Sequence, residues 1–184
     1  MSKATHNVET QRLFDEYLVL AVRSGDRAAG ERLAARWRPR LLRTARRLVG
    51  DMSAAEDVVQ DTWIGIARGV TRLQDPARFP AWAFGILQRR CADHHRRHYR
   101  EREREATLGD NDGATASRAE ARLELDDAFA RLTHEHRTAA VLFYGEGLTL
   151  AEIATATAVP LGTAKSRLFH ARRQLRDLLE GDPS

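Results

Sequence analysis

Cations, hydroxyl groups and one isolated aromatic ring follow one another at helical spacing between residues 163 and 176. At about 100° per residue, Lys165, Phe169 and Arg172 share one side of a helix, and Phe169 points roughly 140° away from the apolar stripe. Cationic side chains bind phosphates, and an exposed ring can contact a thymine methyl group in a major groove. We therefore predict that this helix contacts duplex DNA. The alternative is that Phe169 covers a neighbouring helix or is simply exposed, as single apolar residues often are.

A helix-turn-helix is the element that would position this face. Thr149 and Glu152 have the spacing of a capping box, which predicts the start of a short helix. Pro160 and Gly162 then end that helix and allow a second one to begin. Two short helices, a tight turn and a cationic second helix are typical of a helix-turn-helix, and a structural hairpin with a solvated charged face is the alternative. The residues expected to be buried are Leu148 and Ile153 around the cap, and Ala164, Leu168, Ala171, Leu175 and Leu178 on the second helix.

An acidic helix is predicted nearer the N-terminus. Ser53 and Glu56 match a capping box, so we expect this helix to begin at Ser53. Acidic groups on its exposed side would repel phosphates, so docking of a basic protein partner is the functional interpretation. The alternative is a solvated face that favours the helix N-terminus through its dipole. The apolar stripe comprises Val59, Trp63, Ile66 and Val70, and the exposed side comprises Glu56, Asp57, Gln60 and Asp61.

The next helix, predicted at about 81–100, carries the opposite charge. It follows a proline-containing loop at 74–80, and Trp82 and Phe84 lie at its start. Arginines interleaved with aromatic residues suit backbone contacts and stacking on unpaired bases. The alternative is that the aromatic residues are partly core and the arginines solvated. The cations of this helix are Arg89, Arg90, Arg96, Arg97 and Arg100.

The sequence contains no pattern that indicates an enzyme, a cofactor or a metal site. His94, His95 and His98 lack a carboxylate or cysteine that would complete a site, and residues 134–136 lack the spacing of a helical zinc motif. There is no glycine-rich phosphate loop and no nucleophile motif. Cys91 is the single cysteine, which excludes disulfides and favours a reduced compartment.

Composition and periodicity indicate an all-α protein of two small domains. The 184 residues have a net charge of +4, with 42% hydrophobic and 30% charged residues, which fits a globular chain. The sequence has no signal-like apolar core and no run that could span a bilayer, so we expect a cytoplasmic protein. Only Lys3 and Lys165 among the 30 cations are lysine, a bias that suits bidentate contacts to phosphates and bases.

Breaks in the apolar periodicity divide the chain into three parts. We predict a helical domain at 11–100, a flexible acidic linker at 101–118 and a helix-turn-helix domain at 119–180. Two further helices are expected in the first domain, at 11–24 and at 28–49, and Pro39 should bend or break the second of them.

Three stretches together resemble a known family. In this order, AEDVVQDTW, DPARFPAWAFGILQRRCADHHRR and LTLAEIATATAVPLGTAKSRLFHARRQLR look like regions 2 and 4 of a bacterial sigma factor of the sigma-70 family, extracytoplasmic-function (ECF) group. The resemblance implies a factor that binds core RNA polymerase, directs it to promoters and assists their melting. The implied partners are the β′ clamp and β flap of the polymerase, and promoter DNA that is double-stranded at −35 and melted at −10. An anti-sigma factor is a further candidate partner.

The resemblance also implies roles for single residues. The positions that match the clamp-docking helix are Glu56, Asp57, Gln60 and Asp61. The positions that match the −10 contacts are Arg78, Phe79, Trp82, Arg89, Arg90, Arg96 and Arg97. The positions that match the −35 contacts are Thr163, Lys165, Ser166, Arg167, Phe169, His170, Arg172 and Arg173.

The chain departs from the family pattern at four of its positions. Gly85 stands where an arginine is frequent and Arg89 where an asparagine is frequent, and both bear on the −10 element. Ala164 replaces the usual valine and His170 a common arginine, which bears on the −35 preference. Two other classes of function fit parts of the sequence. One is a DNA-binding regulator without polymerase docking, and the other is a sigma-like decoy that binds polymerase or an anti-sigma factor without initiating.

Overall fold

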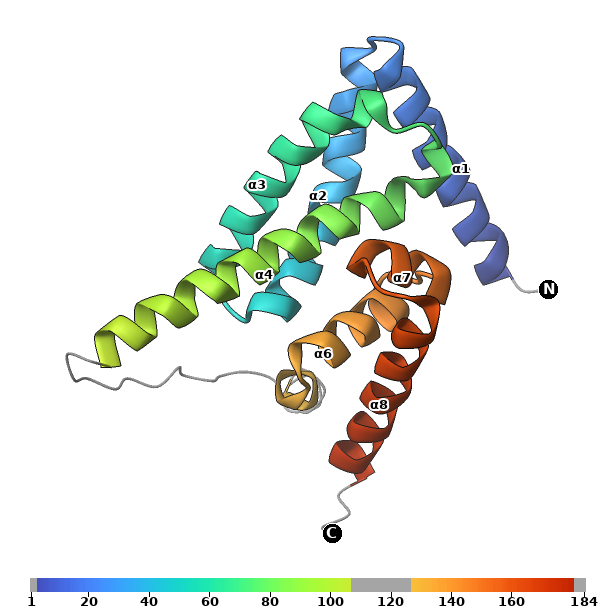
Figure 1. The fold of residues 1–184 in the computed structure, drawn as a ribbon. Helices are drawn as coiled ribbons and strands as arrows, with labels where there is room; N and C mark the ends of the chain where they lie inside the picture. The colour runs from blue at the N-terminus through green and yellow to red at the C-terminus, as the bar shows by residue number, and fades with distance from the viewer. Residues whose placement is uncertain (1–2, 107–126, 181–184) are drawn as a thin grey trace.

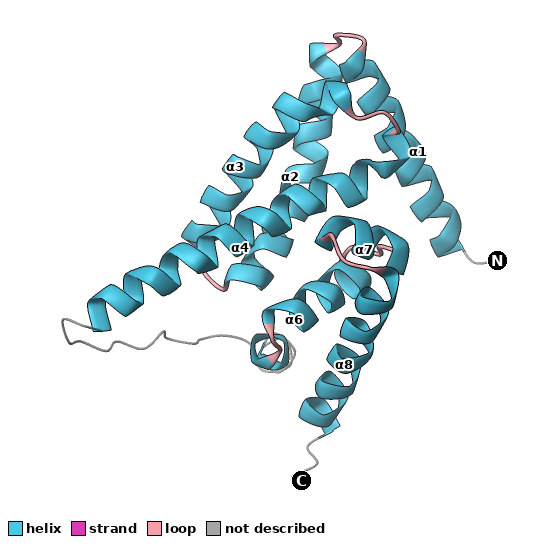
Figure 2. Ribbon diagram, in the orientation of Figure 1, coloured by secondary structure: helices cyan, strands magenta, loops and turns pink. Residues whose placement is uncertain are grey.

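The computed structural model describes residues 3–106 and 127–180, and within these ranges it contains helices and no strand (Figures 1 and 2). The prediction of an all-α chain is confirmed. The long helices are α1 (Lys3–Arg23), α2 (Arg27–Val49), α3 (Met52–Gly69), α4 (Phe79–Ala106) and α8 (Leu161–Glu180). Shorter elements are the 3-10 turns η1 (Val70–Arg72) and η2 (Pro76–Arg78), α6 (His134–Ala140), the π-helical η3 (Val141–Gly145), α7 (Leu150–Thr157) and a helical segment at 127–131.

Helix α2 runs through Pro39 as one element and is not broken there. A proline removes one backbone hydrogen bond, but Trp37 and Leu41 on either side of it are fully buried, so packing holds the helix together. Asp26 caps the start of the helix, and Gly50 ends it in the left-handed region with φ 86°. That region favours glycine because it has no Cβ.

Helix α3 begins one residue earlier than the sequence predicted, and its cap is a different residue. The carboxylate of Asp51, not the hydroxyl of Ser53, caps the helix by accepting from the backbone N–H of Ala54 at 2.7 Å. Gly50 has already ended α2, so Asp51 is extended and takes the cap position itself. The predicted stripe holds, since Val59, Ile66 and Val70 are buried and Trp63 is half-buried.

Helix α4 is longer than predicted at both ends. It begins at Phe79 because Pro80 fits the first turn of a helix, where its missing N–H costs nothing. It continues to Ala106, so the first residues of the predicted 101–118 linker are helical. The rest of that predicted linker lies outside the described residues.

The second domain contains the predicted helix-turn-helix. Thr149 and Glu152 form both hydrogen bonds of a capping box, and Leu148 and Ile153 beside it are buried. The turn to α8 passes through Ala158, which adopts φ 54°. Of the predicted core face of α8, Ala164, Ala171 and Leu175 are buried, Leu168 is half-buried, and Leu178 is exposed.

The two domains pack directly on each other, which the sequence analysis did not predict. Helix α7 lies against α4, as Figure 1 shows near the centre of the molecule. Leu142, Leu148 and Ile153 of the second domain join the same buried cluster as Trp37 and Phe84 of the first. A smaller cluster belongs to the second domain alone and comprises Ala128, Leu132, Ala140, Ala171 and Leu175.

A search of residues 3–106 and 127–180 finds no helix with the length and apolar character needed to cross a bilayer.

Candidate functional site

The outer face of α8 carries an aromatic ring among cations. Phe169 is 63% exposed, so it does not serve to cover a neighbouring helix. Lys165, Arg172 and Arg173 are exposed on the same helix, and none of them appears in an ion pair of the described residues. A free cationic face with one projecting ring has the chemistry that phosphate and major-groove contacts require.

The remaining predicted −35 residues lie at the edges of this face. Ser166 is exposed, and its hydroxyl donates to the carbonyl oxygen of Thr163 at 3.1 Å. Arg167 is half-buried and acts electrostatically on His134 of α6, so it lies toward the protein side of the helix. His170 is exposed beside Phe169, with ring centroids 5.5 Å apart.

His136 belongs to this surface, although the sequence analysis assigned it no role. Its ring stacks on His170, with centroids 5.7 Å apart and an interplanar angle of 25°. Nδ1 of His136 also lies 3.0 Å from Oε1 of Gln174. His136 and His170 are 34 positions apart and lie on different helices, α6 and α8. Local spacing in the sequence could therefore not have revealed their contact. The contact with His136 orients the ring of His170 beside Phe169.

A groove lies between α2 and α3, with Glu56 and Asp57 on its α3 side and Arg38 on its α2 side. It has a volume of about 700 Å³, and its apolar wall includes Leu42, Trp63 and Ile64. Ile64 is 41% exposed, although isoleucine is among the residue types most often buried. Three of the four predicted clamp-docking residues line the groove, namely Glu56, Asp57 and Gln60. Apolar walls with two carboxylates along the α3 side suit a partner helix that has apolar residues on one face and cations facing α3.

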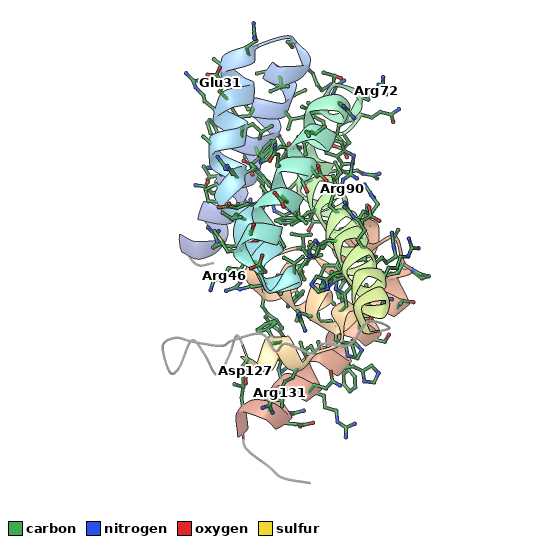
Figure 3. The ribbon with its side chains drawn as sticks, turned by 90° about the vertical axis from the view of Figure 1, so that its left-hand side faces the viewer. Glu31, Arg46, Arg72, Arg90, Asp127 and Arg131 are labelled. Carbon is green, nitrogen blue, oxygen red and sulfur yellow. The ribbon has the colours of Figure 1, made fainter. Side chains whose placement is uncertain are left out.

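Asp61, the fourth predicted docking residue, faces the other way. With Asp57 it lines a smaller cavity of about 180 Å³ between α3 and α4, which also contains Arg90, His94 and Arg97. Burial lowers the pKa of His94, and the neighbouring His95, His98 and Arg97 lower it further. This cavity is the boundary between the acidic surface of α3 and the cationic surface of α4. In Figure 3, Arg90 of α4 stands well above Asp127 and Arg131 of the second domain.

The predicted −10 residues divide into buried and exposed members. Phe79 is fully buried and packs edge-on against Trp37, with centroids 4.9 Å apart, so it is a core residue here and its ring offers no surface to a base. Trp82 is half-buried and lies next to it, 6.0 Å between ring centroids. The placement of Trp82 depends on Gly69, because a Cβ built on Gly69 would stand 2.8 Å from Cζ2 of the indole.

Of the five arginines at this surface, two form ion pairs and three appear in no ion pair between described residues. Arg78 is exposed and pairs with Asp75 at 3.4 Å, and Arg96 pairs with Asp93 one helical turn away. Pairs of this kind at a surface contribute little and exchange readily. Arg89, Arg90 and Arg97 complete the cationic side of α4, with Arg89 and Arg97 exposed and Arg90 half-buried.

Gly85, one of the departures from the family pattern, is buried between the two domains. A Cβ at this position would lie 3.3 Å from the carbonyl oxygen and 3.4 Å from Cα of Ala156 in α7. Ala164, another departure, is fully buried. The closed packing of α7 on α4 therefore leaves no room for an arginine at position 85.

A row of contacting imidazoles runs along α4 and reaches α6 through the contact between His95 and His134. His94, His95, His98 and His134 make edge-on ring contacts with centroids 5.1 to 6.1 Å apart, and His95 Nε2 lies 3.0 Å from the carbonyl oxygen of Leu48. Within the described residues, no three histidine, cysteine or acidic side chains are placed to hold a metal ion. Cys91 is buried, and burial raises the pKa of its thiol to about 12.

Two family models match the chain. Sigma-70 region 2 matches residues 33–101, and Sigma-70 region 4 matches residues 128–177. The first range begins within α2 and ends within α4. The second range covers most of the helix-turn-helix domain.

Curated relatives agree with the family models. The chain is 36% identical to the ECF RNA polymerase sigma factor SigE of Mycolicibacterium smegmatis, in an alignment that covers 85% of this chain and 65% of SigE. It is 36% identical to the ECF sigma factor SigL of Mycobacterium tuberculosis, over 76% of this chain and 82% of SigL. It is 33% identical to the RNA polymerase sigma factor CarQ of Myxococcus xanthus, over 85% of this chain and 92% of CarQ.

Solved structures show the same fold. CnrH in complex with the cytosolic domain of CnrY is 27% identical, with a TM-score of 0.69 over 92% of this chain and 99% of that chain. The sigma factor RpoE in complex with the anti-sigma factor NepR from Bartonella quintana is 24% identical, with a TM-score of 0.71 over 83% of this chain and 98% of that chain. The chain thus belongs to the ECF RNA polymerase sigma factors of the sigma-70 family, non-enzymatic factors that direct RNA polymerase to promoters to initiate transcription.

Proposed function

We propose that this chain recognises both elements of its promoters, with α8 reading the −35 element in the major groove. The exposed ring of Phe169, among cations that form no ion pair with another described residue, is the observation that carries this proposal. Phe169, His170 and Ser166 are proposed to reach base edges. Lys165, Arg172 and Arg173 supply phosphate contacts that fix the register of the helix on the duplex.

The −10 element is the second part of the proposal. A melted strand needs a surface on which an unpaired base can stack and a cationic path for the backbone. Trp82 supplies the ring, and Arg78, Arg89, Arg90, Arg96 and Arg97 supply the path. Phe79 is assigned a supporting role, since it lies beneath Trp82 in the core.

Docking on the polymerase is the third part. The groove between α2 and α3, with Glu56, Asp57 and Gln60 along it, is the surface proposed for the β′ clamp, and Asp61 is proposed to act from the adjoining cavity. The second domain is proposed to contact the β flap. Because its partner would be core RNA polymerase, the proposed place of action is the cytoplasm.

An anti-sigma factor is the remaining proposed partner. The support is that two structurally similar proteins were solved in complexes: the sigma factor RpoE with the anti-sigma factor NepR, and CnrH with the cytosolic domain of CnrY.

Run-off transcription with purified core polymerase on a library of genomic fragments tests the proposal. We expect transcripts that depend on this chain, with start sites that align on two shared upstream elements. Binding to core without any transcript would favour a decoy instead, and absence of core binding would favour a DNA-binding regulator that acts without the polymerase.

A further inference from the structure

The rings on the outer surface of α8 continue onto α6. His170 makes an edge-on contact with Phe169, and it also stacks on His136, with ring centroids 5.5 and 5.7 Å apart. Phe169 and His170 are exposed, whereas His136 is half-buried. The three rings therefore form a row that is exposed at its α8 end and supported by the protein at its α6 end.

His136 is held through both its backbone and its side chain. Its backbone N–H donates to Oγ1 of Thr133, the residue that caps α6, at 3.3 Å. Its Nδ1 lies 3.0 Å from Oε1 of Gln174, which is one helical turn beyond His170 on α8. An amide oxygen only accepts, so Nδ1 of His136 carries a proton and donates it to this hydrogen bond. The neutral ring consequently has one tautomer, and the hydrogen bond limits its rotation.

The packing beneath the two imidazoles belongs to the second domain alone. Ala171 follows His170 on α8, and Leu175 follows Gln174. Both are buried in one cluster with Ala140 of α6. Because alanine side chains are short, α6 and α8 can approach closely at this cluster. The spacing of the two imidazoles is therefore set by the core of the second domain.

The fold of α6 does not require an imidazole at position 136. The hydrogen bond to the Thr133 cap uses only the backbone N–H of His136, which every residue except proline possesses. The two ring contacts of His136, with His170 and with Gln174, both lead to α8. The side chain is thus directed at the helix that carries the predicted −35 residues.

A histidine at position 170 depends on orientation more than an arginine would. One imidazole nitrogen can form a single hydrogen bond with a base edge, whereas the arginine common at this position in the family has a bidentate fork. A single hydrogen bond weakens steeply as its angle departs from linear, so it discriminates between bases only when its direction is fixed. Stacking on His136 fixes the direction of the His170 ring before DNA binds, which also reduces the entropy lost on contact.

We propose that His136 is a positioning residue for recognition of the −35 element. It acts through His170, whose imidazole it orients toward a base edge, and Gln174 in turn orients His136. This inference rests on the proposed function, because it takes α8 as the helix that recognises the −35 element. It assigns part of the base preference to a residue of α6, outside the recognition helix.

Selection from a library of duplex DNA with a randomised segment tests the assignment. The full-length wild-type chain, His136→Ala, His170→Ala and the double variant are each allowed to bind the library, and sequencing of the bound DNA gives the base preference at every position. We expect both single variants to lose preference at the same base pair, by about threefold to tenfold, and the double variant to be no worse than His170→Ala. The preferences at the other base pairs should remain.

Two further variants separate positioning from a general effect on the domain. His136→Phe retains a ring that can stack on His170 but cannot donate to Gln174, so it should keep more of the preference than His136→Ala. His98→Ala removes an exposed imidazole from α4, outside the −35 surface, and should keep the wild-type preferences. Thermal melts of His136→Ala should stay close to the wild type, because the backbone hydrogen bond to Thr133 is retained.

The outcomes distinguish this inference from the proposed function. An unchanged preference in His136→Ala would refute it, and so would equal weakening on every sequence, which would indicate a phosphate contact or a structural role. Additive losses in the double variant would also refute it, because His136 would then contact DNA independently of His170. If the wild-type chain enriches no sequence at all, the proposed recognition of the −35 element fails, and the role of His136 fails with it.

Discussion

Gly69 of α3 lies against the indole of Trp82 at the start of α4, and a Cβ on this glycine would stand 2.8 Å from Cζ2 of the ring. Gly69→Ala should therefore displace Trp82, destabilise the fold by about 1–3 kcal/mol through overpacking, and reduce promoter melting while core binding is retained. Permanganate reactivity of unpaired thymines in the −10 region measures the melting. Gly30→Ala is the control, because its nearest neighbour is Cγ2 of Val22 at an ordinary 3.7 Å, and it should leave melting unchanged.

Phe169→Ala should weaken binding to −35 duplex DNA by about 1 kcal/mol or more, through loss of an apolar base contact. The melting temperature should hardly change, because the ring is 63% exposed and is not part of the core. Fluorescence anisotropy with labelled promoter DNA and a thermal melt supply the two readouts. Leu179→Ala removes another exposed apolar side chain of α8, and an equal loss of affinity in this control would show that the effect is not specific to Phe169.

Asp57→Lys should impair binding to core polymerase, because Asp57 lines both the α2–α3 groove and the cavity beside α4. Reversal of an interfacial charge is expected to cost about 1–3 kcal/mol, less at high salt. Co-elution with core at two salt concentrations provides the measurement. Glu31→Lys makes the same charge change at an exposed position of α2 outside the groove, and similar weakening there would point to net charge as the cause.

Stability should fall as the pH drops from 7.5 to 5.5. Burial lowers the pKa of His134, helped by the nearby His95, so folding disfavours the protonated form of this imidazole. The unfolded chain, with an ordinary histidine pKa of about 6.5, then binds more protons than the folded one, and stability decreases as the pH falls through that range. Thermal melts across this range should show a flatter profile for His134→Gln than for the wild type. His170→Gln removes an imidazole at an exposed position, and an equally flat profile for this control would show that the effect is not specific to His134.

Asp51→Ala should cost about 1 kcal/mol of unfolding free energy, because Asp51 caps α3. Ser53→Ala should cost much less, since Ser53 lies in the first turn and not at the cap. Urea unfolding of both variants distinguishes them. A larger loss for Ser53→Ala would restore the original capping-box prediction.

Local patterns predicted the elements well. The apolar stripe of α3, the capping box of Thr149 and Glu152 and the exposure of Phe169 each depend on residues within one or two helical turns, where spacing determines the outcome. The predicted cap of α3 was wrong because Asp51, two residues before Ser53, also has a side chain that can cap a helix. Gly50 ends α2 in the left-handed conformation, which leaves Asp51 extended at the cap position of α3. The spacing of residue types does not predict that backbone conformation.

Contacts between distant segments could not be predicted in this way. Glu146 meets Arg40 and Thr44 across more than 100 residues, and Gly85 meets Ala156 across 71. In the sequence, Gly85 was only a departure from a family pattern, and Phe79 only an aromatic residue in a DNA-contacting segment. The packing of α7 on α4 explains why position 85 is a glycine, and the contact with Trp37 explains why Phe79 is buried.

The uneven division of apolar residues between the two buried clusters bears on how long the protein persists. The cluster confined to the second domain contains three alanines and two leucines, whereas Leu142, Leu148 and Ile153 lie in the cluster shared with the first domain. A second domain without the first would consequently expose large side chains that chaperones and proteases recognise. Expressed alone, it should therefore be degraded faster than the whole chain.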